Sequence, residues 1–546
     1  MFPLADAMTN ELGSSVLVTE LMIVAAVAIV VKWIRLPYTI ALVTAGLGVG
    51  VLRAQHFIDL DIVLTPELVF TIFLPVLLFE AAINLRVNHL KENAKPIALF
   101  AVPGVIIASL AVGYGLHWWF ELPLAWALVF GALVSATDPI SVLALFKELK
   151  APPRLSILVE GESLFNDGAA VVVFKILLAL ALTGEFSMVS AVFDFLLVSV
   201  GGLLLGALLG YVISQLTAMI DDHLIEITLS TILAYGAYIA AEHLGVSGVM
   251  AVIAAGLIYG NYGKEIGMSP HTQVMMAAFW EYAGFLMNSL VFLLIGTQVD
   301  LRLMVDNWKE IVAAYACVVL VRLFTMAFLV PVAGLLDRPI SFTWQTVIVW
   351  AGLRGSISMA LAIGLPSSQW KDQILLMTFG VVILSLFLQG LSMPRLLRKL
   401  KVIGQNPDEV TDYEIKLGRM LMHQRSLKEL RRMKARLSIS VDVFEELAEP
   451  HEKAAAGLQE ELVELGRKQI SIRQEQVRDA RKNLLNAQLA TLREAHERGL
   501  VSDDVLELLT KELAEEQIRF SEQEHTTQEA ETQSQEQPPP PPEEPE

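Results

Sequence analysis

Two short stretches decide how this chain folds: Val134-Ser-Ala-Thr-Asp-Pro139 and Glu160-Gly-Glu-Ser-Leu-Phe-Asn-Asp167. Both lie inside long apolar runs, residues 122–146 and 156–182, where charged side chains are costly. A proline directly after an aspartate disfavours helix at that aspartate and removes a backbone donor. We therefore expect an interrupted helix at Asp138 and functional carboxylates in both runs.

The composition divides the chain into two parts. Residues 1–401 are dominated by apolar runs and contain 21 Lys and Arg against 27 Asp and Glu, whereas residues 402–546 contain 19 against 31. The net charge of −18 therefore falls mainly on the second part, and an acidic chain of this kind is not expected to bind nucleic acid. The one cysteine, Cys317, allows no internal disulfide.

Apolar runs of membrane-crossing length recur throughout residues 1–401. A bilayer core needs about 20 mostly apolar residues per helix. On that scale the sequence predicts an all-α polytopic membrane protein with about thirteen transmembrane helices in a transmembrane domain, 1–401. They are expected at residues 14–31, 37–52, 65–85, 96–118, 122–146, 156–182, 189–217, 224–242, 246–260, 279–299, 311–334, 341–364 and 373–393.

The short loops between these runs predict the orientation. Loops after odd-numbered spans carry 14 Lys and Arg, and loops after even-numbered spans carry 4. Because basic loops stay on the cytoplasmic side, we expect the N-terminus outside and the C-terminal tail inside.

Helix breakers recur in matching spans. The fifth span contains Ala136-Thr-Asp-Pro139, and the twelfth contains Ala351-Gly-Leu-Arg-Gly-Ser356. An odd number of spans allows two halves whose equivalent helices run in opposite directions, the inverted repeat of many secondary transporters. Glycine is also common in membrane helices, so chance is the alternative. A charge beside a breaker at matching places favours the repeat.

Residues 402–520 lack apolar spans and are expected to form a helical cytoplasmic tail. Basic residues gather at 425–436, where contact with anionic lipid and a solvated helix face are both open interpretations. From residue 521 the chain is rich in Gln, Glu and Thr and ends in prolines and acids, which predicts disorder at 521–546.

Asp167 is the strongest candidate for the functional group. A carboxylate in a low-dielectric interior favours its neutral form, so it can hold either a proton or a cation. Ser163 lies four residues earlier on the same helix face. A break in the fifth span would free the carbonyls of Thr137 and Asp138 to coordinate an ion. We expect a small hard cation at Asp167, Ser163 and Thr137; the alternative is a hydrogen-bonded structural carboxylate.

Glu162 and Asn166 share a helix face that differs from that of Asp167, since successive residues turn by about 100°. We expect Glu162 to form a structural ion pair with Arg354 in the twelfth span, although Arg322 in the eleventh span is a second buried cation. Asn166 is expected to cap the half-helix ends of the fifth span.

Two further charges in apolar runs stay open. Glu80 is an ion- and proton-binding candidate that either lines the ion path or lies near the cytoplasmic mouth. Lys175, two turns beyond Asp167, either has an internal ion partner or extends its ammonium outward.

These residues resemble the sodium/proton exchangers of the NhaP and NHE type, in the monovalent cation:proton antiporter superfamily. The matching pieces occur in family order over about residues 15–395. They are Phe79-Glu-Ala81, Ala136-Thr-Asp-Pro139, Glu160-Gly-Glu-Ser-Leu-Phe-Asn-Asp167, Phe292-Leu-Leu-Ile-Gly296 and Gly352-Leu-Arg-Gly355.

The resemblance implies an NhaA-like antiporter fold with two interrupted, crossing helices in a core domain, a dimerisation domain and a homodimer. It implies alternating access in which the core moves like an elevator. It implies that Asp167 is the shared proton and cation site, supported by Asp138, Thr137 and Ser163. Asn166 gives the Asn–Asp form of the motif, which is associated with electroneutral exchange.

We therefore expect a secondary active Na⁺/H⁺ antiporter of the plasma membrane, with a part in pH regulation, surrounded by membrane lipid and without a cofactor. K⁺/H⁺ or mixed Na⁺/K⁺/Li⁺ exchange is one alternative, because the motifs do not fix ion radius; a gated cation channel is another. An enzyme is not expected, because Gly161-Glu-Ser-Leu-Phe165 is not a Gly-x-Ser-x-Gly nucleophile elbow. We also expect that an unidentified regulator binds the tail.

Overall fold

The structure is a computed structural model of the chain. It describes residues 14–34, 37–55, 64–138, 140–149, 151–220, 222–400, 402, 407–436 and 438–468, with scattered residues between 484 and 513. The chain forms two compact units, Met1–Gly404 and Gln405–Glu546, and each is described by itself. Residues 521–546, for which disorder is expected, lie outside the described part.

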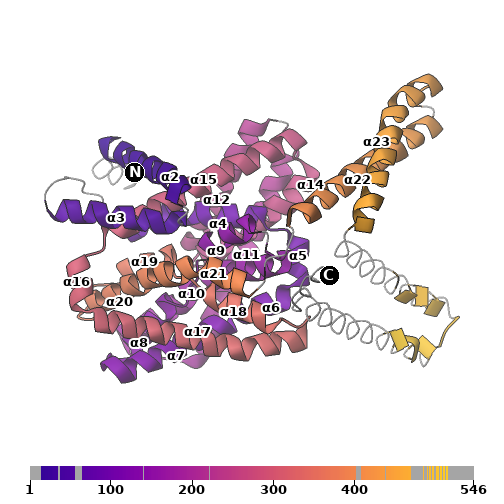
Figure 1. Cartoon of the computed structure of the whole chain (residues 1–546). Coiled ribbons are helices and arrows are strands. Elements are labelled where there is room, and N and C mark those ends of the chain that lie inside the picture. The colour runs from indigo at the N-terminus through magenta and orange to yellow at the C-terminus, as the bar shows by residue number, and fades with distance from the viewer. Residues whose placement is uncertain are drawn as a thin grey trace, which may run out of the picture. The chain divides into compact units, whose positions relative to one another are not determined.

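Every regular element among the described residues of the first unit is helical (Figure 1). Apolar helices suit a membrane, because they satisfy their own backbone hydrogen bonds where no water is present. The elements are α2 (Ser14–Ile34), α3 (Tyr38–Ala54), η1 (Leu68–Phe73), α4 (Leu74–Asn84), α5 (Val87–Glu92), α6 (Ala94–Ala101), α7 (Pro103–Phe120), α8 (Leu124–Leu133), α9 (Ile140–Glu148), α10 (Pro153–Thr183), α11 (Met188–Thr217), α12 (His223–His243), α13 (Gly248–Ile258), η2 (Tyr259–Gly263), α14 (Lys264–Ile266), α15 (Pro270–Thr297), α16 (Leu301–Asp306), α17 (Trp308–Leu336), α18 (Phe342–Trp350), α19 (Ser356–Ile363), α20 (Lys371–Leu384), η3 (Ser385–Gly390) and α21 (Leu391–Lys399).

A described helix overlaps each of the thirteen expected ranges. By length and composition, 7 helical stretches among the described residues are able to cross a membrane. They are Ala94–Phe120, Pro153–Thr183, Met188–Thr217, His223–His243, Pro270–Thr297, Trp308–Leu336 and Lys371–Lys399. The other expected ranges overlap helices that are shorter or interrupted, and the π-helical turns η1, η2 and η3 widen three of the spans. The first unit is therefore a polytopic helical membrane protein.

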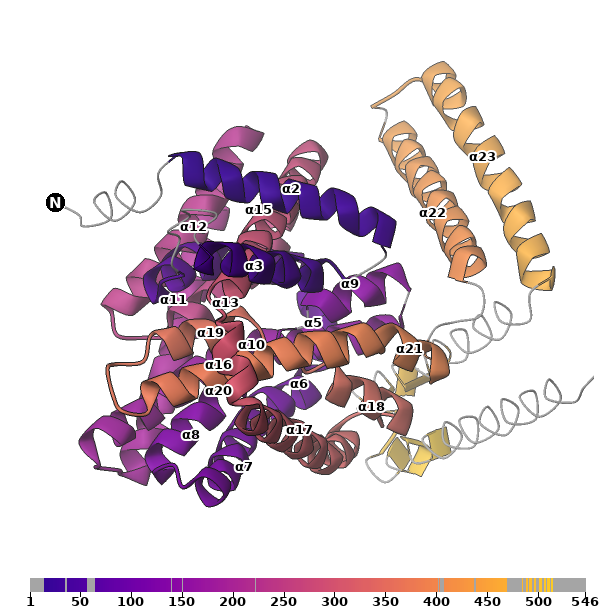
Figure 2. The same cartoon turned by 60° about the vertical axis from the view of Figure 1, so that its left-hand side comes forward.

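The helices of the first unit pack as two bundles, which Figures 1 and 2 show from two sides. In bundle one, which comprises α2–α4 and α11–α15, α13 packs on α4, α11 and α12, and α15 packs on α3. In bundle two, which comprises α6–α10 and α17–α21, α8 packs on α7 and α10, and α17 packs on α7 and α20. Helix α10 also contacts α4, α11 and α13 across the boundary, so it lies where the bundles meet.

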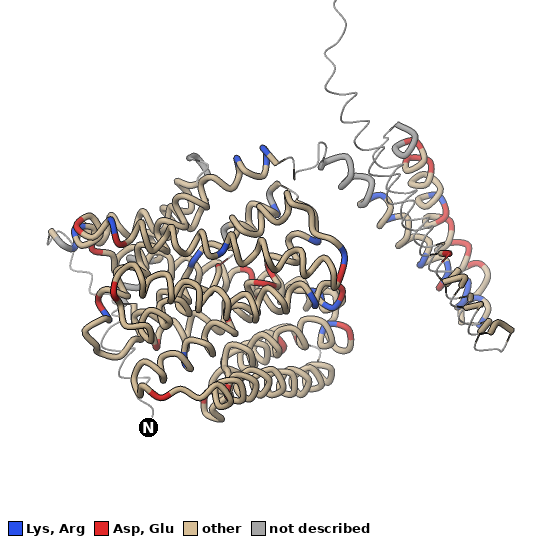
Figure 3. Tube along the Cα trace, turned by 90° about the horizontal axis from the view of Figure 1, so that it is seen from below, with Lys and Arg blue, Asp and Glu red and all other residues tan. Residues whose placement is uncertain are grey.

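Charged side chains are sparse in the first unit and dense in the second. In Figure 3 the helices of the first unit are mostly tan, whereas α22 (Pro407–Ala435) and α23 (Val441–Lys468) carry red and blue at close intervals. The helices of the second unit therefore have charged surfaces. The few charged side chains inside the apolar first unit are the candidates for a functional role.

Helices α22 and α23 form an antiparallel hairpin. Lys416 pairs with Glu461 at 3.0 Å, and the Nδ1 atoms of His423 and His451 lie 2.8 Å apart. Within the basic region 425–436, Arg431 and Arg432 pair with glutamates at 3.6 Å and 3.5 Å, and Lys434 lies over the Phe444 ring. Three basic groups of this region therefore have partners within the hairpin.

Small residues allow α11 and α13 to approach closely. Gly202, Gly206 and Gly210 recur every four residues on α11, and a Cβ at each would meet backbone atoms of α13. At Gly206 the contact is with the carbonyl oxygen of Ala251. Membrane helices pack through such small residues because van der Waals contact between them replaces the hydrophobic effect.

Gly206→Ala should therefore destabilise bundle one by about 1–3 kcal/mol, the usual cost of overpacking. Gly236→Ala on α12 is the matched control, because a Cβ there meets nothing within 4 Å; alanine should gain up to about 1 kcal/mol of helix propensity. The thermal unfolding midpoints of the detergent-purified variants measure both. Equal midpoints for the two variants would contradict the proposed packing role.

Candidate functional site

Two helices of bundle two are interrupted, and the interruptions meet. The described residues 134–138, after α8, and residues 351–355, between α18 and α19, are not helical. The backbone N–H of Asp138 donates a hydrogen bond of 2.8 Å to the carbonyl of Leu353. Both breaks are where the sequence predicts them. This backbone hydrogen bond joins one break directly to the other.

Arg354 closes the end of α8. Its Nη1 donates to the carbonyls of Ser135 and Ala136 at 2.8 Å and 3.1 Å. The hydroxyl of Ser358, on α19, donates to the carbonyl of Leu133 at 2.7 Å. A helix end leaves carbonyls without partners and carries partial negative charge, so a buried guanidinium both satisfies and neutralises it. Arg354 is only 4% exposed.

Asp138 lies at a helix N-terminus, whereas Arg354 bonds the carbonyls of a helix C-terminus. Its Oδ1 accepts a hydrogen bond of 3.0 Å from the N–H of Ile140, at the start of α9. A Cβ on Gly355, the N-cap of α19, would contact this carboxylate, so glycine is needed there. A carboxylate is stabilised at helix N-termini by free N–H groups and by the helix dipole. Its Oδ2 is buried without a hydrogen-bond partner, which leaves one oxygen available to a cation.

Helix α10 docks on the break through Thr137. The Ser163 hydroxyl donates to the Thr137 carbonyl, and Asn166 Nδ2 donates to the Thr137 hydroxyl at 3.2 Å. Asp167 follows Asn166 on α10 and is thereby placed beside the same break. The break therefore holds Ser163, Asn166 and Asp167 together, as the spacing suggests. Two details differ: the Thr137 carbonyl is not free, and Asn166 contacts a side chain rather than capping a half-helix.

Glu162 pairs with Arg322, not with Arg354. Its two carboxylate oxygens accept bonds of 2.5 Å and 2.9 Å from the guanidinium of Arg322 on α17. The predicted Glu162–Arg354 pair is therefore wrong. The reason lies in the crossing, because Nη1 of Arg354 donates to the carbonyl groups at the end of α8 instead. The pair is structural, since both side chains are buried and Glu162 does not line the cavity described next.

A cavity of about 1020 Å³ reaches the break from one side. Asp167, Glu160, Asp138, Ser163 and Thr137 line it, and so does Glu80 from α4 in bundle one. Asn84 Nδ2 donates to the Glu80 carboxylate at 3.1 Å. The lining also includes Lys147 and Ala151, which border a basic loop on the expected cytoplasmic side. The position of Glu80 on the cavity wall agrees with the interpretation that Glu80 lines the ion path.

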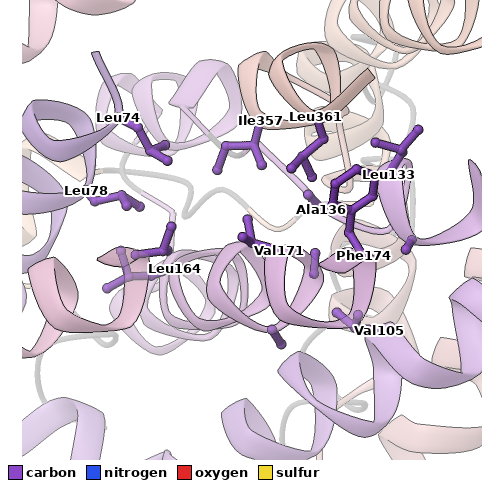
Figure 4. Packing of buried hydrophobic residues seen from close by; sticks show 14 of the residues in the cluster. Leu74, Leu78, Val105, Leu133, Ala136, Leu164, Val171, Phe174, Ile357 and Leu361 are labelled. Carbon is purple, nitrogen blue, oxygen red and sulfur yellow. The ribbon is translucent and has the colours of Figure 1, made fainter. Parts of the chain in front are cut away.

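Beyond Asp167 the structure is closed by apolar side chains. Val171 and Phe174 follow Asp167 by one and two turns on α10 and are buried. In Figure 4 they face Leu133 and Ala136 beside the end of α8 and Ile357 and Leu361 of α19. Asp167 is the last residue of α10 in the cavity lining, so the apolar layer closes that end of the cavity.

The oxygen atoms around Asp167 suit a small, hard cation. Two carboxylates, a hydroxyl and a backbone carbonyl come together, and such oxygens are the ligands of ions without soft character. No group of three or more His, Cys, Asp or Glu side chains within the described ranges forms a metal site.

Some parts of this site are not evident from sequence reasoning. The hydroxyl groups of Ser358 and Ser385 tie α19 and the Arg354 backbone to their neighbours, at 2.7 Å and 3.1 Å. Serines of this kind occur throughout apolar helices and give no signal of their own. The sequence does give a signal for Arg322, because an arginine alone in an apolar span needs a buried anion.

Known proteins resemble this chain over most of its first unit. The family described as sodium/hydrogen exchanger, transmembrane, matches residues 21–399. The Na⁺/H⁺ antiporter ApNhaP of Aphanothece halophytica is 42% identical over 398 residues, 71% of this chain and 75% of that protein. The Na⁺/H⁺ antiporter NhaG of Bacillus atrophaeus is 38% identical over 510 residues, 91% of this chain and 96% of that protein.

A solved structure has the same fold. The sodium proton antiporter MjNhaP1 of Methanocaldococcus jannaschii matches with a TM-score of 0.56 over 70% of this chain and 97% of that one. Its sequence identity is 22%, so the likeness concerns the fold.

The Glu162–Arg322 pair gives a test of the site's architecture. Glu162→Gln or Arg322→Gln alone should cost about 3–5 kcal/mol of stability, because each leaves a buried charge without its partner. The double variant Glu162→Gln with Arg322→Gln should lose less than the sum. Thermal unfolding of the four proteins forms a double-mutant cycle. Strictly additive losses would show that the two side chains do not act as a pair.

Proposed function

The chain belongs to the sodium/hydrogen exchanger family, whose members are secondary transporters and not enzymes, and from that premise we propose that it exchanges Na⁺ for H⁺ through Asp167. The observation that carries the proposal is the place of this carboxylate. It lies at the closed end of a cavity of about 1020 Å³, beside two interrupted helices.

Competition at one carboxylate couples the two ions. Protonated Asp167 has no charge with which to hold Na⁺, and Asp167 with bound Na⁺ has little affinity for a proton. Each crossing therefore carries one ion or the other. The larger gradient then decides the direction of net exchange, and the transporter contributes to pH regulation.

The charge balance of the site supports one-for-one, electroneutral exchange. Glu162 is neutralised by Arg322, and Asp138 is held at the start of α9. Asp167 is then the one carboxylate at the break whose charge is left to the transported ion. Asp138, Thr137 and Ser163 would supply further oxygens, and Glu80 would attract cations along the wall. Asn166 fixes Thr137 and does not line the cavity.

Because the cavity is closed beyond Asp167, transport through this site requires alternating access. The cavity opens beside the basic loops, which by the positive-inside rule face the cytoplasm. Bundle two would then move against bundle one to expose Asp167 to the other side. The buried side chains of Val171 and Phe174 beyond Asp167 support this view over a gated channel.

The wider arrangement is part of the same proposal. We expect thirteen spans with an inverted repeat, an outer N-terminus and a cytoplasmic tail. The protein would be a homodimer in the plasma membrane, in contact with lipid. The geometry favours neither Na⁺ nor K⁺, so relatives named Na⁺/H⁺ antiporters support Na⁺ as the first ion to test.

Asp167→Asn should abolish exchange and leave the protein folded, since the amide has the same shape but cannot titrate. Dequenching of a pH-sensitive dye in proteoliposomes, after Na⁺, Li⁺ or K⁺ is added, measures exchange and ion preference together. Asp194→Asn, on α11 and away from the cavity lining, is the matched control. Exchange retained by Asp167→Asn would remove this carboxylate from the mechanism.

Competition predicts a particular pH dependence. Where protons occupy Asp167, each unit of acidification should raise the half-saturating Na⁺ concentration up to about tenfold, by mass action. The maximal rate at saturating Na⁺ should stay constant over the same range. Initial rates across a grid of pH and Na⁺ concentration test this. A maximal rate that falls while half-saturation stays fixed would argue against a shared site.

A further inference from the structure

One ion pair connects the two bundles on the closed side. Lys175 Nζ of α10 lies 3.2 Å from both carboxylate oxygens of Glu242 on α12. Helix α10 belongs to bundle two and α12 to bundle one. The other two ion pairs between described residues of the first unit, Arg322–Glu162 and Arg154–Asp337, each join helices or adjoining loops of bundle two.

The position of this pair relative to Asp167 is informative. Lys175 follows Asp167 by eight residues, a rise of about 12 Å along the helix. It thus lies beyond the apolar layer of Val171 and Phe174, on the side away from the cavity. Glu242 is at the last turn of α12, which ends at His243. The pair therefore spans the bundle boundary where the site is closed.

We infer that Lys175 and Glu242 form an outer latch, which stabilises the state with Asp167 open to the basic side and thereby sets the Na⁺ affinity measured from each side. The inference rests on the proposed alternating access. To open the site outward, bundle two must move from bundle one near the end of α12, and the pair breaks. Both residues act as positioning residues, since neither lines the cavity.

The size of the effect follows from the exposure of the pair. The side chains of Lys175 and Glu242 are 52% and 40% exposed, so screening keeps their attraction modest. Losing an exposed ion pair shifts a two-state equilibrium about two- to fivefold. The apparent affinity at a site scales with the fraction of molecules in the competent state. Breaking the latch should therefore lower the half-saturating Na⁺ concentration outside and raise it inside.

The test compares Lys175→Gln and Glu242→Gln with the exchanged pair, Lys175→Glu with Glu242→Lys. Half-saturating Na⁺ is measured in right-side-out and everted membrane vesicles that carry the full chain. Each single variant should change the ratio of inner to outer half-saturation by about two- to fivefold, and the exchanged pair should restore it. Asp337→Asn is the matched control, because it breaks the 3.4 Å pair with Arg154 inside bundle two.

The results that would overturn the latch differ from the result that would reject the proposed function. A ratio that is unchanged in both single variants, or that the exchanged pair fails to restore, overturns the latch. A change of the same size in Asp337→Asn also overturns it, because any lost ion pair would then suffice. Absence of Na⁺-driven exchange in the wild-type vesicles would instead reject the proposed function.

A second measurement does not depend on transport. Ala81→Cys, in a Cys317→Ala background, puts a thiol on the cavity wall. Adding Glu242→Gln should slow its labelling by a charged thiol reagent applied to the basic side. Unaltered labelling would count against the latch even in a variant that transports poorly.

Discussion

The structure depends on the hydrogen bond between the Asp138 N–H and the Leu353 carbonyl, where two interrupted helices meet. Helix ends inside a membrane expose backbone groups that no water can satisfy. Here the ends satisfy one another: Arg354 from one break bonds the carbonyls of the other, and Asp138 accepts from the start of α9. A cation at one end and an anion at another also match the signs of the helix dipoles. The cost of breaking two helices is thereby offset within the crossing itself.

This compensation is consistent with the proposal that Asp167 is the group left for transport. Four carboxylates lie in the two stretches that carry the site, and two of them have fixed structural partners. Glu162 is held by Arg322 and Asp138 by Ile140. Glu160 and Asp167 also line the cavity, and Asp167 is the one that adjoins Asn166, which bonds Thr137 of the break. The crossing therefore gives Glu162 and Asp138 structural partners, which agrees with the exchange role proposed for Asp167.

The sequence predicts the local features of this site better than its long-range contacts. The breaks follow from Pro and Gly in apolar runs, and the shared face of Ser163 and Asp167 follows from helical periodicity. The partner of Glu162 does not, because it depends on which helix packs against α10. Periodicity shows only that Glu162 and Asp167 point apart. In the same way, Lys175 has two open interpretations until α12 is seen beside α10.

Helix α10 connects the site with the closed side of the protein. It runs unbroken from Pro153 to Thr183 and presents different faces to the cavity, to Arg322 and to bundle one. An unbroken helix transmits displacement along its axis, since its backbone hydrogen bonds resist bending. Any movement of Asp167 relative to bundle one must therefore move Lys175 relative to Glu242. The site at Asp167 and the closed side are connected by the stiffness of one helix. The interrupted helices beside it supply the polar groups that an unbroken helix cannot.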